Sequence, residues 1–388
     1  MTLHFHHALP PGGDPPDGVL RLVVLQPTPF CNIDCDYCYL PGRQDRQVMS
    51  AEVLRAIYRN LFASRLLARE VTIVWHAGEP LAAGRAFYES AFRFAGHTPP
   101  PSRQMIHSIQ TNGTLIDQGW CDLFKTHSIR VGVSLDGPAF LHNARRKTRS
   151  GAGTHDRVMH GIALLQSNEI PFHVITVLTR DHLNHADELF AFYLRNHIQR
   201  VAFNIEEIEG AHTSSSLKAE AVESCYRAFL KRLYRTAEDS RRQLRVREFD
   251  GLMSFLRVPE GRIEHSFQAA PFGILNVDCR GNFSTFSPEL LGMKSSVYGD
   301  LILGNVLEDT FESALATEKF RRMNEDVQAG VEACRQSCAY FALCGGGAPA
   351  NKYWENGSFR STETMYCRLT KQALVDVVFE ELEAGLDA

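Results

Sequence analysis

The protein has 388 residues, of which 44% are hydrophobic and 22% are charged, and its net charge is -4 at pH 7. This composition predicts a soluble globular protein with one large domain and a smaller one, and the near-neutral charge excludes a strongly basic nucleic-acid or membrane binder. The N-terminus lacks a signal-peptide pattern, and no apolar run reaches the ~20 residues of a membrane span. We therefore expect a cytoplasmic protein with neither a nucleic-acid nor a membrane partner.

The first 210 residues alternate apolar, β-rich segments with amphipathic helical ones. Strands are predicted at residues 21–27, 71–76, 105–110, 129–135, 171–179 and 199–207, and helices at 50–67, 86–94, 115–127, 155–168 and 181–196. Six strands that alternate with helices indicate an α/β protein with a parallel sheet, wound either as a barrel or as an open doubly wound sheet.

The pattern changes after residue 208. A polar break, EGAHTSSSLK, leads into a predicted helix at 217–239, a hairpin-like stretch at 274–286 and a terminal helix at 369–385. We divide the chain into an N-terminal tail (1–19), a barrel domain (20–210), a helical linker region (211–265) and a C-terminal domain with the terminal helix (266–388).

Seven of the ten cysteines fall in two groups. The first is C-x3-C-x2-C in the stretch PFCNIDCDYCYLPG, and the second is spread over the C-terminal domain. Disulfides are rare in the cytoplasm, so this grouping favours metal binding. Four thiolates can hold an iron-sulfur cluster, with zinc as the alternative, whereas three thiolates leave one iron of a 4Fe-4S cluster open to an outside ligand. The ligands are Cys31, Cys35 and Cys38 in the first group and Cys334, Cys338, Cys344 and Cys367 in the second.

Polar and glycine-rich residues follow the predicted strands. The cysteine motif follows the first strand, and HAGEP (76–80), TNG (111–113) and SLDG (134–137) follow the next three. The carboxyl ends of successive parallel strands are where a βα fold builds its site. Asn204 and Glu206 alternate to one face of the sixth strand, either as substrate contacts or as an ordinary polar pair.

The cysteine motif, with Tyr37 before its last cysteine, resembles that of the radical S-adenosylmethionine (SAM) enzymes. In this family, the amino and carboxylate groups of SAM chelate the open iron. An electron from the cluster then cleaves SAM to methionine and a 5'-deoxyadenosyl radical, which abstracts hydrogen from the substrate. The resemblance covers residues 20–384 and implies a partial (β/α)6 TIM-like barrel with a C-terminal iron-sulfur extension.

The resemblance also implies a set of SAM contacts. Gly78 and Glu79 match the motif that receives the SAM amino group, with an alanine before them where a glycine is more usual. Ser134 and Asp136 match the position near the ribose, and Arg146 matches the arginine that faces the SAM carboxylate. The full predicted set of cofactor contacts is Tyr37, Gly78, Glu79, Gln110, Asn112, Ser134, Asp136 and Arg146.

The second cysteine group resembles the SPASM extension of peptide-modifying radical SAM enzymes, which normally has seven cysteines and two auxiliary 4Fe-4S clusters. The cysteines for the first of these are absent: Phe286 stands where one would follow Gly281, and Ala348 stands beyond the Cys344-GGG run. We therefore expect one auxiliary cluster, and two 4Fe-4S clusters in total. Cys279 is either a structural thiol or an additional ligand.

Residues 344–373 resemble the cyclophane-forming peptide maturases of the glycine-rich-repeat (GRRM-type) subgroup. More distantly, the chain resembles anaerobic sulfatase maturases, which carry an aspartate base where Ser287 stands here. The resemblance implies a radical SAM oxidoreductase that joins an aromatic ring carbon to the Cβ of a nearby residue in a ribosomal precursor peptide. It also implies an external electron donor such as flavodoxin or ferredoxin. The alternatives are another radical SAM peptide maturation (thioether, epimer or formylglycine formation) and a non-catalytic iron-sulfur electron carrier.

Overall fold

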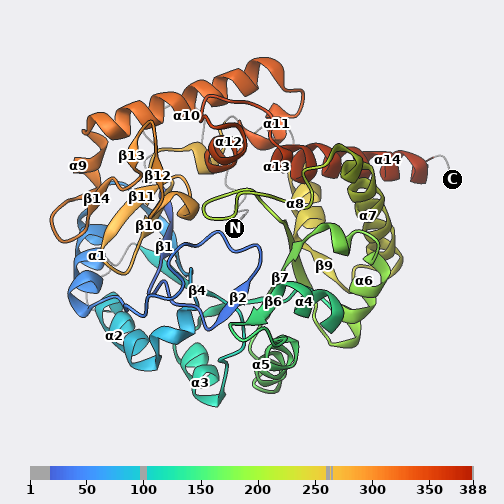
Figure 1. The fold of residues 1–388 in the computed structure, drawn as a ribbon, viewed down its shortest axis with the longest axis horizontal. Coiled ribbons are helices and arrows are strands. Elements are labelled where there is room, and N and C mark those ends of the chain that lie inside the picture. The colour runs from blue at the N-terminus through green and yellow to red at the C-terminus, as the bar shows by residue number, and fades with distance from the viewer. Residues whose placement is uncertain (1–17, 97–102, 259–262, 264, 387–388) are drawn as a thin grey trace.

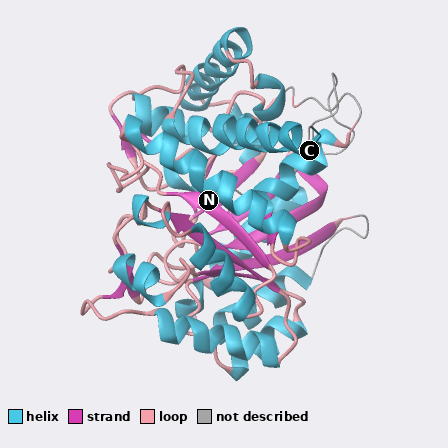
Figure 2. Ribbon diagram, turned by 90° about the vertical axis from the view of Figure 1, so that its right-hand side faces the viewer, coloured by secondary structure: helices cyan, strands magenta, loops and turns pink. Residues whose placement is uncertain are grey.

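The structure, a computed structural model, describes residues 18–96, 103–258, 263 and 265–386. All but the last two residues of the predicted tail at 1–19 thus lie outside the described residues. Seen down its shortest axis, the molecule is a ring of helices around a curved sheet (Figure 1). The view from the side shows the strands running between layers of helices (Figure 2).

Ten strands form one sheet in the order β14-β11-β10-β1-β3-β4-β5-β7-β8-β9. Six neighbouring strands in its centre are parallel, which confirms the predicted partial (β/α)6 barrel. These strands are β1 (Leu20–Leu25), β3 (Leu67–Trp75), β4 (Gln104–Thr111), β5 (Arg130–Ser134), β7 (Phe172–Leu178) and β8 (Arg200–Ile205).

Helices between these strands cover the outer face of the sheet. In the first helix, the side chain of Ser50 accepts a hydrogen bond from the backbone N–H of Val53 at 3.2 Å, which caps the helix, and Leu54, Ile57 and Leu61 turn inward. The helices are α1 (Ala51–Ala63), α2 (Arg85–Gly96), α3 (Gln118–Thr126), α4 (Ala139–Arg145), α5 (His155–Ser167) and α6 (Ala186–Arg195), with short 3-10 turns at Pro80–Ala83 and Arg180–His182.

Later segments extend the barrel sheet at both edges. Beyond β8, α7 (Glu220–Asp239) leads to β9 (Arg245–Val246) and α8 (Arg247–Leu256). On the other side, β10 (Ile274–Val277) runs parallel to β1 and forms an antiparallel hairpin with β11 (Asn282–Thr285), followed by β14 (Gly304–Asn305). The hairpin forms where the sequence predicts one, and it belongs to the same sheet as the barrel.

The rest of the C-terminal region is mostly helical and lies along one side of the ring in Figure 1. Arg227 of α7 pairs with Asp376 at 2.9 Å, which ties the terminal helix to the barrel. The elements are η3 (Phe267–Ala269), η4 (Pro288–Leu290), β12 (Lys294–Ser295), β13 (Gly299–Asp300), α9 (Phe311–Leu315), α10 (Glu318–Ser337), α11 (Phe341–Cys344), α12 (Pro349–Asn356), α13 (Met365–Cys367), a π-helical turn (Arg368–Ala373) and α14 (Leu374–Leu386).

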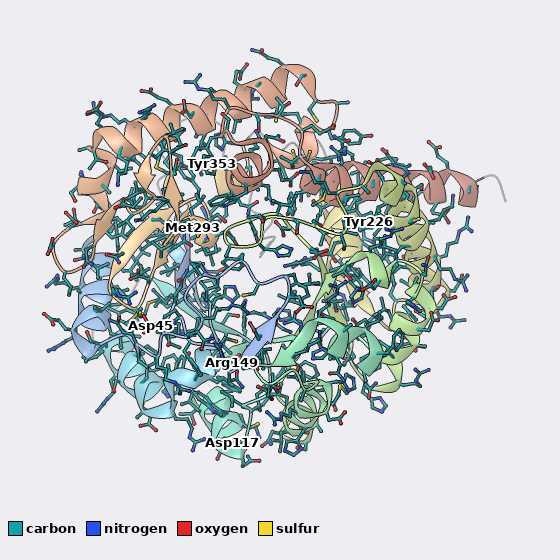
Figure 3. All side chains as sticks on the ribbon, viewed as in Figure 1. Asp45, Asp117, Arg149, Tyr226, Met293 and Tyr353 are labelled. Atoms are coloured by element: carbon teal, nitrogen blue, oxygen red, sulfur yellow. The ribbon has the colours of Figure 1, made fainter. Side chains whose placement is uncertain are left out.

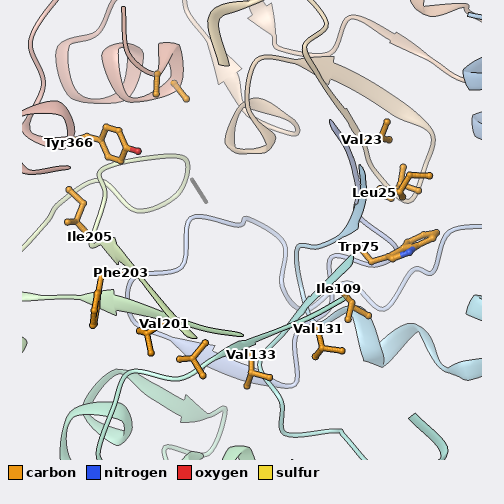
Figure 4. Packing of buried hydrophobic residues seen from close by; sticks show 14 of the residues in the cluster. Val23, Leu25, Trp75, Ile109, Val131, Val133, Val201, Phe203, Ile205 and Tyr366 are labelled. Carbon is orange, nitrogen blue, oxygen red and sulfur yellow. The ribbon is translucent and has the colours of Figure 1, made fainter. Parts of the chain in front are cut away.

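The main apolar core lies between the sheet and the helices (Figure 4). Trp75 of β3 is fully buried there, and its ring meets that of Tyr88 of α2 edge-on at 5.2 Å. A smaller cluster of Leu22, Val24, Val74 and Ile274 lies on the opposite face of the sheet, because successive strand residues point to opposite faces. Among the described helices, none has the length and hydropathy needed to span a membrane.

Candidate functional site

The first cysteine group lies on the loop that follows β1. Within this loop, β2 (Ile33–Cys35) pairs with β6 (Arg146–Thr148), which sets Cys35 opposite Arg146. Arg149, labelled in Figure 3, donates two hydrogen bonds to the carbonyl of Cys31, at 3.1 and 2.7 Å. The cysteine loop is therefore anchored from both ends by residues that lie more than a hundred positions later in the chain.

The thiols of this loop face hydrogen-bond donors. Nη1 of Arg146 lies 3.9 Å from the sulfur of Cys35, and Nδ2 of Asn112 lies 3.8 Å from the sulfur of Cys31. Burial, and then the carboxyl group of Glu79, raise the pKa of the Cys31 thiol to about 12, and burial also raises the pKa of Cys35. A thiol must lose its proton to bind iron, so the positive charge of the metal has to offset this burial. Donors that face the sulfurs favour that thiolate state, and the three residues fit an iron-sulfur cluster.

The HAGEP turn after β3 packs directly against the cysteine loop. The backbone N–H of Glu79 donates to the carbonyl of Phe30 at 2.7 Å. Gly78 has a φ of +59°, and a Cβ at this position would lie 2.5 Å from the carbonyl oxygens of Phe30 and Thr28. Ala77 also has a positive φ, of 70°. Glycine is thus required at 78, whereas the alanine at 77 adopts the backbone conformation that a glycine would favour.

Glu79 is fully buried and joins the ends of β3 and β4. Its carboxylate accepts hydrogen bonds from the hydroxyl of Thr111 at 2.6 Å and from the backbone N–H groups of Asn112 at 2.8 Å and Leu81 at 3.0 Å. Burial raises its pKa to about 7 in spite of these three bonds. The carboxylate therefore accepts hydrogen bonds from donors of the chain itself. Its contact with the SAM amino group stays a prediction.

Asp136, Arg146 and Tyr37 form one buried network. Arg146 donates to both carboxylate oxygens of Asp136, at 2.9 and 3.1 Å, and the hydroxyl of Tyr37 donates to the same carboxylate. Burial alone would raise the pKa of Asp136, but Arg146 holds it below its usual range. Three of the predicted SAM contacts thus bind one another, and the network reaches Cys35 through Arg146.

Two histidines hold Asp136 in place, and the sequence analysis did not identify them. His142 accepts a hydrogen bond from the backbone N–H of Asp136 at 3.2 Å, and Nε2 of His182 lies 3.2 Å from its carbonyl oxygen. Both rings are fully buried, and burial lowers the pKa of His142 to about 3, so its ring is neutral. His142 lies four residues before Arg146, and this spacing within the HNARR stretch was the available signal.

The remaining predicted SAM contacts lie at the ends of β4 and β5. Gln110 donates from its side-chain amide to the hydroxyl of Ser134 at 3.0 Å, and Asn112 donates to the side chain of Asn32 at 2.8 Å. Asn112 therefore joins the end of β4 to the cysteine loop. The structure brings all eight predicted SAM contacts to the carboxyl-terminal edge of the barrel, beside the first cysteine group.

The second cysteine group gathers around the short helices of the C-terminal region. Cys334 lies in the last turn of α10, Cys338 caps that helix, Cys344 ends α11 and Cys367 lies in α13. Cys344 is close enough to Cys334, Cys338 and Cys367 for their charges to influence one another. The backbone N–H of Thr364 donates to the sulfur of Cys367 at 3.3 Å. The four predicted ligands are therefore neighbours in space.

A buried lysine supplies a physical test of whether this group suits a metal centre. Lys352 is 3% exposed, and its ammonium group contacts the sulfur of Cys334 at 3.2 Å and the carbonyl of Gly330 at 2.8 Å. Within the described part of the chain, no carboxylate forms an ion pair with it. A buried ammonium is costly unless negative charge lies nearby. Thiolates bound to a metal supply that charge, so the residues fit a metal-sulfur centre.

Among the residues that the structure describes, no three histidine, cysteine, aspartate or glutamate side chains are placed to hold a single metal ion. In a 4Fe-4S cube each cysteine binds a different iron, so the ligands of a cluster do not meet at one point. Cys279 lies apart from both groups: it is 3% exposed in the β10–β11 turn, and its charged neighbours are Asp278, Arg280 and Asp45.

Apolar packing occupies the positions where a second auxiliary cluster would have its ligands. Phe286 is fully buried, and its ring lies parallel to that of Phe320 at 6.5 Å. Ala348 is 7% exposed. Both positions thus belong to the apolar core, and the predicted absence of this cluster stays a prediction.

Buried carboxylates between the barrel mouth and the C-terminal region were also missed by the sequence analysis. Glu207 accepts a hydrogen bond from Asn351 of α12 at 2.7 Å, and Glu289 accepts one from the hydroxyl of Ser287. Burial, and then Glu207 and Glu289, raise the pKa of Glu209 well above its usual range. The spacing of Glu207, Glu209 and Glu289 in the sequence does not predict that they lie close together, because the segments that carry them lie far apart in the chain.

A cavity of about 530 Å³ lies where the barrel sheet meets the C-terminal helices. Ile175 of β7 and Asn204 of β8 line it on the barrel side, and Leu343, Tyr366 and Lys371 line it on the other. Asn204 accepts a hydrogen bond from Arg247 at 2.8 Å. The sequence predicts that Glu206 lies on the same face as Asn204. In the structure its carboxylate accepts a hydrogen bond from the backbone N–H of Ser216 at 2.8 Å, and Glu206 does not line this cavity.

Solved structures share this fold. The structure of native anSMEcpe with bound AdoMet and Cp18Cys peptide matches with a TM-score of 0.75 and 21% identity, over 94% of this chain and 98% of that one. The structure of Streptococcus suis SuiB bound to precursor peptide SuiA matches with a TM-score of 0.62 and 17% identity, over 90% of this chain and 76% of that one.

Sequence relatives cover nearly the whole chain. An uncharacterized protein of Synechocystis sp. is 48% identical over 95% of this chain and 94% of its own length. The serine-type anaerobic sulfatase-maturating enzyme of Klebsiella pneumoniae is 26% identical over 88% of this chain and 85% of its own. The model of the radical SAM superfamily matches residues 25–193, which hold the first cysteine group and the strand ends around it. This part of the chain belongs to the radical SAM superfamily.

Proposed function

We propose that this enzyme modifies a ribosomally made precursor peptide and forms a carbon–carbon crosslink between an aromatic ring carbon and the Cβ of a nearby residue. The C-terminal resemblance at residues 344–373 supports the crosslink. The names of similar proteins support a peptide or protein substrate, since they include sulfatase-maturating enzymes and SuiB bound to a precursor peptide. The cofactors of the family are a 4Fe-4S cluster and SAM, and we propose one auxiliary cluster in addition.

Cys31, Cys35 and Cys38 would hold the first cluster. When bound, this cluster and SAM supply a 5'-deoxyadenosyl radical that takes a hydrogen atom from the substrate. The chain itself contributes rigidity, because the pairing of β2 with β6 and the contacts of Asn112 and Arg146 fix the cysteine loop against the barrel. Such preorganisation keeps a reactive radical at its target and away from water.

The SAM pocket would lie along the ends of β3, β4 and β5. We propose that Gln110 and Ser134 contact SAM directly, since both are only partly buried. Asp136 uses two of the three guanidinium nitrogens of Arg146, and the third, Nη1, faces Cys35. We assign the predicted contact with the SAM carboxylate to this nitrogen. A reduced flavodoxin or ferredoxin would supply the electron.

One observation carries the proposal of a peptide substrate: the cavity between the barrel and the second cysteine group. Leu343 and Tyr366 line it, and each is the chain neighbour of a cysteine in that group. Asn204 of β8 lines the opposite wall. A cavity of about 530 Å³ has room for a few side chains, with apolar walls and some polar groups that orient them. A peptide held there would touch both the barrel and the auxiliary site.

Co-expression with any small peptide that the neighbouring genes encode tests the proposal. The peptide is purified and its mass and fragmentation are measured. A crosslink removes two hydrogen atoms per site and suppresses fragmentation between the joined residues. If the mass is unchanged while the anaerobic enzyme still cleaves SAM, the proposed crosslink on this peptide is wrong, although the family assignment stands. Absence of SAM cleavage would instead favour the alternative of an electron carrier.

Formylglycine formation is a second candidate. The similarity to sulfatase-maturating enzymes spans most of the chain. The chain has Ser287 where those enzymes carry an aspartate, yet the carboxyl group of Glu289 is buried two residues further on and accepts a hydrogen bond from Ser287. A peptide with a cysteine or serine sulfatase motif tests this candidate. Conversion to formylglycine would replace the crosslink proposal, and an unmodified peptide would count against the second candidate.

A further inference from the structure

Two lysines approach the second cysteine group from different elements. Lys352 of α12 contacts the sulfur of Cys334 at 3.2 Å. Lys371 is partly exposed and lies four residues after Cys367, in the turn that follows α13. It lines the cavity together with Leu343 and Tyr366, the chain neighbours of Cys344 and Cys367. The four cysteines are therefore accompanied by two ammonium groups.

The charge of these lysines favours one redox state of a cluster. Four thiolates and a 4Fe-4S core together carry a net negative charge, and one-electron reduction adds one more negative charge. A cation in a low-dielectric interior stabilises the more negative state most, because Coulomb interactions are weakly screened there. Charge and hydrogen bonds near the sulfurs are among the factors that set the potential of such clusters.

We propose that Lys352 and Lys371 raise the reduction potential of an iron-sulfur cluster held by Cys334, Cys338, Cys344 and Cys367, so that this cluster accepts an electron readily. Both lysines are positioning residues, since they act through the cluster. The inference rests on the auxiliary cluster in the proposed function. It adds that electrons pass from the peptide to this cluster.

An electron-accepting centre narrows the class of reaction. In an oxidative crosslink, the 5'-deoxyadenosyl radical takes a hydrogen atom from the Cβ of the peptide and becomes 5'-deoxyadenosine. The Cβ then bonds to the ring, and the ring releases one proton and one electron. An oxidised auxiliary cluster held by the four cysteines would accept this electron, and water or a nearby carboxylate would take the proton. Epimerisation is redox-neutral and needs no such acceptor. The two lysines therefore favour a net oxidation of the peptide.

The test uses the full-length protein with Cys31, Cys35 and Cys38 replaced by alanine, so that the second group alone can hold iron. Iron content and the midpoint potential are measured anaerobically by redox titration followed by electron paramagnetic resonance. In this background Lys352→Met keeps the length of the side chain and removes its charge. Lys319→Met is the matched control, because Lys319 is only partly buried and pairs with Asp300 at 2.5 Å, at the start of α10 and away from the cysteines.

We expect Lys352→Met and Lys371→Met each to lower the midpoint potential by at least a tenfold change in the reduction equilibrium, about 59 mV for one electron. Lys319→Met should leave the potential unchanged. Unchanged midpoint potentials in both Lys352→Met and Lys371→Met would overturn the inference while the auxiliary cluster stands. If Lys352→Met fails to retain iron, the result for Lys371→Met alone decides. No iron, or zinc, in the background protein would overturn the auxiliary cluster and the inference together.

Discussion

At the scale of single residues, Asp136 and Arg146 form a buried ion pair in the proposed SAM site. The two side chains are 0% and 8% exposed, respectively. Asp136→Asn would leave the guanidinium of Arg146 buried without its counter-charge. Removing one partner of a buried pair typically costs about 3–5 kcal/mol. We predict a loss of this size in the free energy of unfolding, measured by urea denaturation.

An exposed ion pair serves as a matched control, because it shows what the loss of an ion pair costs when its side chains are not buried. Arg232 and Asp187 form an ion pair at 2.7 Å whose side chains are 59% and 55% exposed. Exposed pairs contribute at most about 1 kcal/mol, so Arg232→Gln should change the unfolding free energy little. Equal effects of Arg232→Gln and Asp136→Asn would contradict the assignment of Asp136 and Arg146 as a structural pair.

Glu79 makes stability depend on pH. Burial raises the pKa of its carboxyl group from 4.5 to about 7, so the folded state binds this proton more tightly than the unfolded state does. Stability from this group is therefore present below pH ~4.5 and declines as the pH rises to about 7, by roughly 3 kcal/mol. We predict that the unfolding free energy of the wild type falls relative to that of Glu79→Gln over this interval. A pH-independent difference would contradict the prediction.

At the scale of elements, the turn after β3 positions the cysteine loop. A Cβ at Gly78 would lie 2.5 Å from two backbone oxygens of that loop, whereas a Cβ at Gly84, whose φ is +84°, meets no atom within 4 Å. Both Gly→Ala variants carry the strain of a positive φ. We therefore predict that Gly78→Ala loses iron from the first cluster and that Gly84→Ala retains it. The measurement is iron per chain after anaerobic reconstitution, and equal iron contents would refute this role of the turn.

The alternation of strands and helices was predictable from sequence because each element has its own periodicity and turn residues. The cysteine motif and the polar strand ends were also predictable, since a parallel βα fold places successive strand ends on one edge. The pairing of β10 with β1 was not, because it joins segments some 250 residues apart whose apolar patterns fit many partners. The burial of Glu207, Glu209 and Glu289 likewise depends on how the C-terminal region docks.

At the scale of the whole molecule, the two cysteine groups predict a division of labour. Cys338 caps α10 in the C-terminal region, and the first group lies on the barrel loop after β1. We predict that Cys338→Ala still produces 5'-deoxyadenosine but forms much less modified peptide. The measurement is the ratio of the two products, with circular dichroism as the check on folding. Loss of SAM cleavage in a folded Cys338→Ala variant would contradict independent roles.

The most direct test of the account is SAM cleavage by the first cysteine group. Wild-type protein and Cys31→Ala are reconstituted anaerobically with iron and sulfide, reduced and incubated with SAM, and 5'-deoxyadenosine is measured. The account predicts formation of 5'-deoxyadenosine by the wild type and none by Cys31→Ala. Equal amounts from both proteins, or none from a wild type that holds its iron, would contradict it.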